Sequence, residues 1–149
     1  MLQYKRRGII VNILFFLSPK MGLEYLHDTN TVRQAIEKIR IKGYTAIPVV
    51  SKKDGSYVGT VSEGDFLWTI INNNYLNIKE LENIRISDII DKTKYQSVKI
   101  DQEMDDLLNL IMQQNFVPVV DDRNVFMGII TRRRVIEYLY DESRQQNEK

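Results

Sequence analysis

The chain has no cysteine and a single histidine among its 149 residues. The absence of cysteine excludes disulfides, thiolate nucleophiles and cysteine-ligated metals. One histidine cannot build a histidine-rich metal site, and it argues against a conventional catalytic triad. The net charge is only +1, which supplies no bulk attraction to nucleic acid or to a membrane. We therefore expect a cytoplasmic protein with no metal site, no nucleic-acid partner and no membrane partner.

Long hydrophobic runs are also scarce. The most apolar stretch near the N-terminus, residues 8–17, follows Lys5-Arg6-Arg7, which is the order found in a secretory signal. No small-residue cleavage site comes after it, and the run is too short to span a bilayer. We interpret it as a first helix that packs on the core and ends near Pro19.

Residues 1–10 have a second interpretation. Lys5-Arg6-Arg7-Gly8 can be the translation of a purine-rich ribosome-binding site, and Val11 lies where a GTG start codon would follow. On this hypothesis residues 1–10 are translated leader. The intact mass of the endogenous protein tests it, and a chain that begins at Met1 would contradict it.

What the sequence does contain is a repeated pattern. GYTAIPVV (residues 43–50) returns in altered form as NFVPVV (residues 115–120). Each copy is followed by a polar turn, a glycine-containing apolar strand and a hydroxyl residue, Ser62 or Thr131, that opens a helix. Because two copies are too few for a solenoid, we expect them to pack around a pseudo-twofold axis.

An amphipathic helix precedes each copy, and Gly43 is placed to end the first of these helices. With a short strand before each helix, both halves read β-α-β-β-α, which predicts an α/β fold. The strands are apolar on both faces, so we expect the halves to share one core. The expected strands are 23–26, 47–50, 57–61 and 97–100, and the later helices begin at residues 62, 87, 104 and 131, the last ending near residue 140.

The repeats also suggest domain boundaries. The expected divisions are an N-terminal extension (1–11), a first repeat (12–74), a linker (75–85), a second repeat (86–140) and a polar tail (141–149) that frays.

Ser62 and Asp65 open the helix after the first copy. A serine followed three residues later by a carboxylate is typical of a helix N-cap. Alternatively, a carboxylate at this position can chelate the two vicinal hydroxyls of a ribose. From this copy alone, capping is the favoured interpretation.

Thr131-Arg132-Arg133-Arg134 opens the corresponding helix with three cations, against the helix dipole. A misplaced charge costs about 0.3–1 kcal/mol at an exposed site. Free N–H groups, a hydroxyl and guanidinium groups favour a phosphate, so we expect these arginines to bind phosphate and to be unnecessary for folding. The alternative is a solvated charge run paired with Glu137 or Asp141.

Tyr44, Thr45 and Ala46 precede the first repeated strand. An aromatic face, a hydroxyl and free backbone groups suit a nucleobase, which would stack on the ring and hydrogen-bond at its edge. The alternative is that Tyr44 is a core aromatic. Trp68 and Ile136 lie on the helices after each copy, where they are interpreted as core or dimer-interface residues.

The cassettes GYTAIPVVSKKDGSYVGTVSEGDF (residues 43–66) and NFVPVVDDRNVFMGIITRRRV (residues 115–135) resemble a tandem pair of CBS domains, a Bateman module. The resemblance extends from about residue 12 to residue 140 and includes no catalytic domain. It implies binding of adenine nucleotides in clefts between the halves, and association into flat dimers.

The resemblance also assigns candidate residues, because each cleft takes its base-reading edge from one repeat and its Ser/Thr-x-x-Asp element from the other. The first cleft would combine Tyr44, Thr45, Ala46, Pro48, Ile129, Thr131, Arg132, Arg133 and Arg134. The second would combine Thr60, Ser62, Asp65, Phe116 and Pro118.

Arg134 departs from the family pattern, because it occupies the position of the ribose-chelating aspartate. This substitution favours a phosphate-rich ligand. GYTAIPV together with TRR is similar to stand-alone bacterial CBS pairs that bind cyclic di-AMP, some of which carry a lysine after the first proline, for which Lys20 is a candidate.

The leading hypothesis is a non-enzymatic, homodimeric sensor of an adenine nucleotide (cyclic di-AMP, AMP or ATP) that signals to an unknown partner protein and needs no cofactor and no catalytic residue. One alternative is a small phosphohydrolase or transferase with Asp65 as base. Another is a ligand-free structural or dimerisation module.

Overall fold

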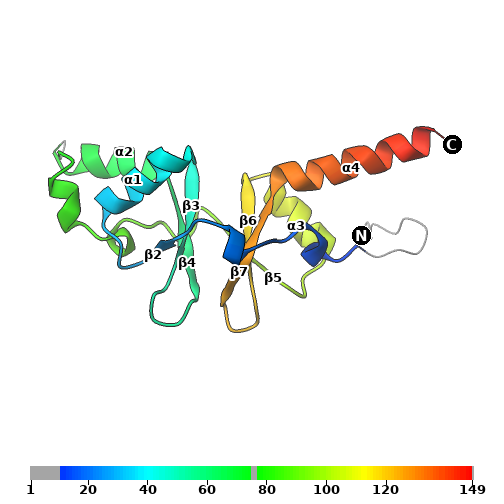
Figure 1. The fold of residues 1–149 in the computed structure, drawn as a ribbon, viewed down its shortest axis with the longest axis horizontal. Helices are drawn as coiled ribbons and strands as arrows, with labels where there is room; N and C mark the ends of the chain where they lie inside the picture. The colour runs from blue at the N-terminus through cyan, green and yellow to red at the C-terminus, as the bar shows by residue number, and fades with distance from the viewer. Residues whose placement is uncertain (1–10, 75–76, 149) are drawn as a thin grey trace. The chain divides into compact units, whose positions relative to one another are not determined.

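A computed structural model describes residues 11–74 and 77–148; the interpretation of residues 1–10 as leader falls outside these ranges. Both halves follow the predicted order of strands and helices (Figure 1). The elements are β1 (Ser18–Pro19), β2 (Leu26–His27), α1 (Val32–Lys42), β3 (Ala46–Val50), β4 (Tyr57–Ser62), α2 (Glu63–Asn72), β5 (Val98–Lys99), α3 (Met104–Ile111), β6 (Phe116–Val120), β7 (Phe126–Thr131) and α4 (Arg132–Asn147).

Helix α1 shows how local sequence sets these bounds. The Thr31 hydroxyl accepts a hydrogen bond from the Gln34 amide at 3.2 Å, and the Gln34 side chain accepts from the Thr31 amide at 2.9 Å. This capping box starts the helix. Gly43 ends it with φ +69°, a left-handed conformation that glycine adopts without a steric penalty.

The strands form two sheets, each containing one repeat's three strands. In the first, β3 pairs in parallel with β2 and antiparallel with β4. In the second, β6 pairs in parallel with β5 and antiparallel with β7, whose other edge pairs with β1. Both hairpins shift register at the same place, after Val49 and after Val119. The two copies therefore share their backbone irregularities as well as their sequence pattern.

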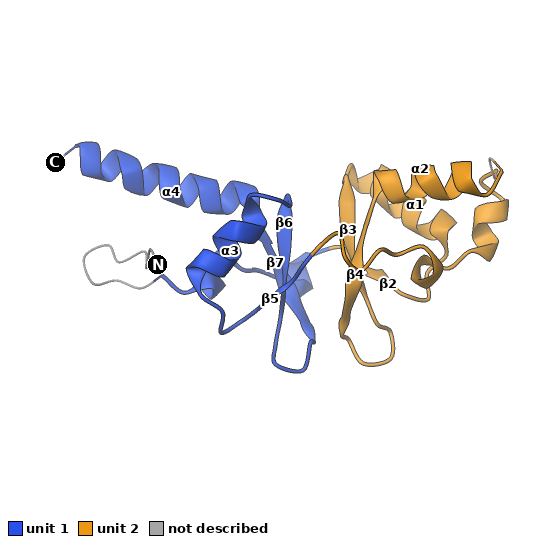
Figure 2. Cartoon of the chain, turned by 180° about the vertical axis from the view of Figure 1, so that it is seen from behind, with its two compact units in different colours: residues 1–23, 96–149 blue, residues 24–95 orange. Residues whose placement is uncertain are grey.

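The chain divides into two compact units (Figure 2). Unit 2 is Glu24–Tyr95, and unit 1 joins Met1–Leu23 to Gln96–Lys149. Residues 12–23, assigned by sequence to the first repeat, thus pack with the second, and residues 86–95 pack with the first. The sequence boundaries describe the repeats and not these packing units, so they stay predictions.

Strand β1 can pair with β7 because the residue opposite Pro19 is a glycine. Ser18 lies opposite Ile129, and Pro19 lies opposite Gly128. Gly128 has φ +150°, and a Cβ atom there would lie 2.2 Å from the Ser18 carbonyl oxygen. Only a residue without a side chain allows β1 to approach β7 at this point.

Each unit buries its own apolar cluster, and the expectation of one common core stays a prediction. The helices of each repeat pack on their own sheet, which supplies a partner for its apolar face. In unit 2 the cluster includes Leu26, Val32, Ala35, Ile39, Ile47, Val49, Val61, Phe66, Leu81 and Ile86. In unit 1 it includes Ile13, Phe16, Val98, Leu107, Ile111, Val117, Val119, Ile130 and Val135.

At the N-terminal end of the described chain a helix packs on the core as predicted, and at the C-terminal end the helix is longer than predicted. The apolar N-terminal run forms a short 3₁₀ helix, Ile13–Phe16, which buries Ile13 and Phe16. At the other end, α4 continues to Asn147 instead of stopping near residue 140. The residues after Tyr140 are mostly good helix formers with no glycine or proline, and the Arg144 guanidinium lies over the Tyr140 ring at 5.9 Å.

Across residues 11–74 and 77–148, no helix is both long and apolar enough to cross a membrane.

Candidate functional site

The two sheets place the predicted helix-opening residues at equivalent positions. Ser62 lies opposite Ala46 in the first hairpin, and Thr131 lies opposite Phe116 in the second. Three residues beyond each hydroxyl stand Asp65 and Arg134. The structure therefore supports the alignment in which an arginine replaces the carboxylate in the second copy.

Asp65 is both a capping residue and a buried carboxylate. Its Oδ2 accepts hydrogen bonds from the Ser62 amide at 2.8 Å and from the Ser62 hydroxyl at 3.1 Å. Its Oδ1 accepts from the Lys94 ammonium at 2.6 Å, and only 7% of the residue is exposed. Burying a carboxylate is costly unless it is paired and hydrogen-bonded in this way. The hydrogen bond that Lys94 donates to Asp65 raises the pKa of Lys94, so the ammonium stays charged.

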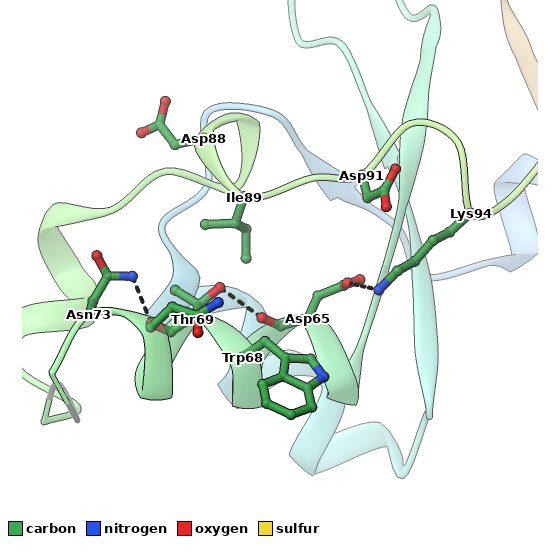
Figure 3. Close-up of a pocket in the computed structure, with 9 residues that line it drawn as sticks. Asp65, Trp68, Thr69, Asn73, Asp88, Ile89, Asp91 and Lys94 are labelled. Carbon is green, nitrogen blue, oxygen red and sulfur yellow. Dashed lines mark hydrogen bonds and ion pairs between the residues drawn. The ribbon is translucent and has the colours of Figure 1, made fainter.

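A cavity of about 330 Å³ lies beside this carboxylate (Figure 3). Helix α2 and the residue after it form one wall, with Trp68, Thr69, Asn72 and Asn73. The segment before β5 forms the other, with Asp88, Ile89, Asp91 and Lys94. All of these residues belong to unit 2. The cavity is acidic, since three aspartates line it beside one lysine.

Thr60 and Pro48, two further candidates, lie opposite each other in the β3–β4 hairpin. Thr60 is fully buried, and its hydroxyl shares a 2.7 Å hydrogen bond with the Tyr57 hydroxyl. Burial raises the pKa of Tyr57, so the phenol stays neutral. The Thr60 hydroxyl thus has a partner within the hairpin.

The segment before β3 is accessible. Tyr44 is 39% exposed and Thr45 is exposed, whereas Ala46 is buried at the start of the strand. This exposure contradicts the interpretation of Tyr44 as a core aromatic. The Thr45 carbonyl accepts from the Glu63 amide at 3.0 Å, so the start of α2 holds this segment in place. The exposed ring and hydroxyl are free to meet a ligand.

Two of the three arginines in the first turn of α4 have partners inside unit 1 that the sequence did not suggest. The Arg132 Nε donates to the Ile111 carbonyl at 2.8 Å, and its Nη1 donates to Asn115 Oδ1 at 3.0 Å. The Arg134 guanidinium lies 5.8 Å from the centre of the Phe15 ring. That folding does not need Arg132 stays a prediction, against which stands the hydrogen bond of this side chain to a carbonyl at the C-terminal end of α3.

Arg133 matches the alternative interpretation more closely. Its side chain is 88% exposed and forms an ion pair with Glu137 at 2.9 Å. The Thr131 hydroxyl accepts from the Arg134 amide at 3.2 Å and caps the helix. Phosphate binding by these residues stays a prediction.

The remaining candidates lie at the start and middle of the second hairpin. Pro118 lies opposite Ile129, whose other neighbour is Ser18. The Phe116 carbonyl accepts from the buried Gln114 side chain at 3.0 Å. The second copy is two residues shorter than the first from the start of its helix to the start of its strand, because α3 has three residues fewer than α1 and the loop after it has one more.

Lys94, Phe15 and Gln114 were missed by sequence reasoning. Each contacts its partner through tertiary packing or through a loop. None belongs to a sequence motif or to a periodic pattern from which the contact could be predicted. In the part of the chain that the structure describes, no group of three or more histidine, cysteine or carboxylate side chains is arranged so that it could hold a metal ion. The joining of residues from both repeats in one cleft stays a prediction.

Comparison with known proteins supplies the family. The family model described as CBS domain matches residues 21–72 and 86–141. Uncharacterized protein MJ1426 of Methanocaldococcus jannaschii is 29% identical, with 76% of this chain and 84% of that protein covered. CbpB, solved in complex with c-di-AMP, has a TM-score of 0.82 at 21% identity, covering 93% of this chain and 91% of CbpB.

A further similar structure is CBSX2 in complex with AMP, with a TM-score of 0.71 and 23% identity. It covers 89% of this chain and 98% of CBSX2. At these identities the two solved structures establish a shared fold. The matched family model covers both repeats, so the chain belongs to the CBS domain family.

Proposed function

We propose that this chain is a cytoplasmic, non-enzymatic regulatory sensor that binds an adenine nucleotide through its CBS repeats and signals to a partner protein. Membership of the CBS family supports nucleotide binding. Similarity in fold to CbpB with c-di-AMP and to CBSX2 with AMP supports an adenine ligand. Cyclic di-AMP, AMP and ATP are the candidates.

The buried carboxylate of Asp65 is the observation that carries this proposal. An ionised carboxylate is costly to bury, and capping alone can be performed by an exposed residue. Asp65 is nevertheless 7% exposed, is held by Ser62 and lines a cavity. A fixed carboxylate of this kind is suited to accept hydrogen bonds from the two vicinal hydroxyls of a ribose.

Arg133 and Arg134 support a ligand that carries phosphate. Both are exposed in the first turn of α4, where they oppose the helix dipole. Arg134 also replaces the carboxylate that would bind a second ribose. Cyclic di-AMP fits this combination best, because its two phosphates can meet the arginines and its esterified 3′-oxygens leave no vicinal diol that would need a second carboxylate.

Signalling would follow from a change in the surface that the protein presents. A ligand shifts a conformational equilibrium only by its difference in affinity for the two states. We propose a homodimer as the signalling species, with exposed Trp68 on α2 and exposed Ile136 on α4 at its contacts.

Thermal unfolding across a ligand panel tests the proposal. Cyclic di-AMP, AMP or ATP should raise the melting temperature in a concentration-dependent way, because a ligand that binds only the folded state stabilises it by RT ln(1 + [L]/Kd). Asp65→Asn should reduce the shift, whereas the matched Asp122→Asn on an exposed turn should leave it unchanged. No shift with any nucleotide would support a ligand-free module, and turnover of the ligand would support the phosphohydrolase.

A further inference from the structure

The cavity beside Asp65 has a lysine bound at the carboxylate. Lys94 reaches from the segment before β5 across to α2, where its ammonium lies 2.6 Å from Asp65 Oδ1 (Figure 3). The two residues are 29 positions apart in the chain, so the contact is tertiary. Lys94 is 45% exposed along its side chain, which leaves it free to move without disturbing the core.

The Lys94 ammonium occupies Asp65 Oδ1, the carboxylate oxygen that a ribose hydroxyl would need as an acceptor. Oδ2 of Asp65 already accepts two hydrogen bonds from Ser62. A vicinal diol chelates a carboxylate by donating to both of its oxygens, so one hydroxyl must bind Oδ1. There it competes with the ammonium of Lys94.

The competition affects nucleosides and nucleotides differently. A nucleoside would replace a charged partner of Asp65 by neutral hydroxyls and return the ammonium to water. A hydrogen bond between charged groups is about twice as strong as a neutral one, so this exchange is unfavourable. A nucleotide brings a phosphate that can pair with the displaced ammonium, which restores a charged hydrogen bond.

We propose that Lys94 is an internal occupant of the Asp65 site, which a ligand must displace, and that the displaced ammonium pairs with the phosphate of the ligand. Lys94 is then a specificity-determining residue that makes the site prefer nucleotides to nucleosides. This inference rests on the proposed function, since it concerns the same carboxylate.

The other two aspartates of the cavity and the neighbouring Lys92 do not share this role. Asp91 binds the amide and hydroxyl of Thr93, at 2.9 and 2.6 Å. Asp88 accepts from the Arg85 amide at 3.4 Å and is exposed. Lys92 is an exposed lysine two positions from Lys94, and it is not among the residues that line the cavity. It therefore supplies a control with the same change of charge.

The test compares by calorimetry the affinities of adenosine and AMP, which carry a free vicinal diol, and includes cyclic di-AMP, whose 3′-oxygens are esterified, as a test of nucleotide binding itself. Lys94→Met keeps an apolar stem and removes the ammonium, and Lys94→Gln keeps a hydrogen-bond donor for Asp65 so that the fold is retained. In both variants we expect adenosine to bind about tenfold more tightly, because it no longer has to displace an ammonium from Asp65 and one charged hydrogen bond accounts for a change of this size. AMP should bind with nearly unchanged affinity, because the ion pair that it breaks and the one that it forms are both absent. The preference for AMP over adenosine should therefore fall about tenfold. Lys92→Met should keep the preference of the unaltered protein.

The outcomes separate the two proposals. If the unaltered protein binds AMP or cyclic di-AMP but its preference over adenosine is the same in the Lys94 variants, the displaced-lysine inference is wrong and the proposed function stands. If Lys92→Met loses the preference for AMP over adenosine to the same extent, the effect comes from the loss of one positive charge anywhere near the cavity, and the inference is overturned. If the unaltered protein binds none of the three ligands, the proposed function fails and this inference fails with it.

Discussion

Arg132 and Ile111 connect two helices of unit 1: the guanidinium Nε of Arg132, in the first turn of α4, donates to the carbonyl oxygen of Ile111, the last residue of α3, at 2.8 Å. The carbonyls at the end of a helix lack partners within it and carry partial negative charge. A cation that is unfavourable at the start of its own helix is thus favourable at the end of a neighbouring one. The same contact orients the loop before β6, through Asn115.

Arg132→Ala should therefore destabilise the empty protein by about 1–2 kcal/mol, through loss of hydrogen bonds from a charged group that is half-buried. Arg133→Ala is the matched control, because an exposed i,i+4 ion pair contributes only about 0.3–0.5 kcal/mol. Chemical denaturation of the two variants measures the difference. Equal stabilities would contradict the role assigned to Arg132.

Gly128→Ala should cost more stability than Gly43→Ala. Both glycines have positive φ, which costs an ordinary residue about 1–2 kcal/mol. A Cβ at Gly43 meets nothing within 4 Å, whereas one at Gly128 collides with the backbone of Ser18. Thermal unfolding should rank the two variants in this order, and hydrogen exchange should show loss of protection near Ser18 only in Gly128→Ala.

We predict that AMP binds more tightly than GMP. The backbone around Thr45 and Ala46 would pair the amine and ring nitrogen of adenine, and the reversed donors and acceptors of guanine leave groups unpaired at about 1–3 kcal/mol each. Calorimetry with both ligands measures the ratio. Tyr44→Ala should weaken both by removing a stacking surface and should keep their ratio; equal affinities in the unaltered protein would contradict base reading here.

The dimer prediction concerns Trp68 and Ile136, which are 56% and 53% exposed. Trp68→Glu combined with Ile136→Glu should give monomers in sedimentation, because charges disrupt an apolar contact. Ile41→Glu, at an apolar residue of α1 that is 76% exposed, is the control. An unchanged dimer in the double variant would exclude these helices as the interface.

Alkaline pH should weaken the fold through Tyr57, whose pKa is raised above its usual value of 10.0 by burial. Above about pH 10 the unfolded chain releases this proton while the folded one keeps it, so the free energy of unfolding falls as pH rises. Denaturation between about pH 9 and pH 11 should show a weaker fall in Tyr57→Phe than in Tyr140→Phe, an exposed tyrosine. Identical pH dependence would contradict this role.

Local patterns predicted the elements because each one leaves a signature in neighbouring residues. Gly43 as a C-cap is confirmed, and so are the helix started by Ser62 and the β-α-β-β-α order of both repeats. The hydrogen bond of Arg132 to α3 could not be predicted, because a dipole argument considers one helix at a time and the partner lies on another helix. Lys94 beside Asp65 and Phe15 beneath Arg134 depend on tertiary packing that no local periodicity encodes.

The pairing of Ser18 with Ile129 has a consequence for the order in which the protein can form during synthesis. Unit 2 is one continuous stretch, so it can fold as soon as residue 95 has left the ribosome. Unit 1 cannot fold at that stage, because β1 is synthesised early and its partner β7 is synthesised almost last. Contacts between residues so far apart in the sequence also form slowly. Until β7 arrives, β1 and the buried residues Ile13 and Phe16 have no permanent partner, and the nascent chain is most exposed to aggregation there.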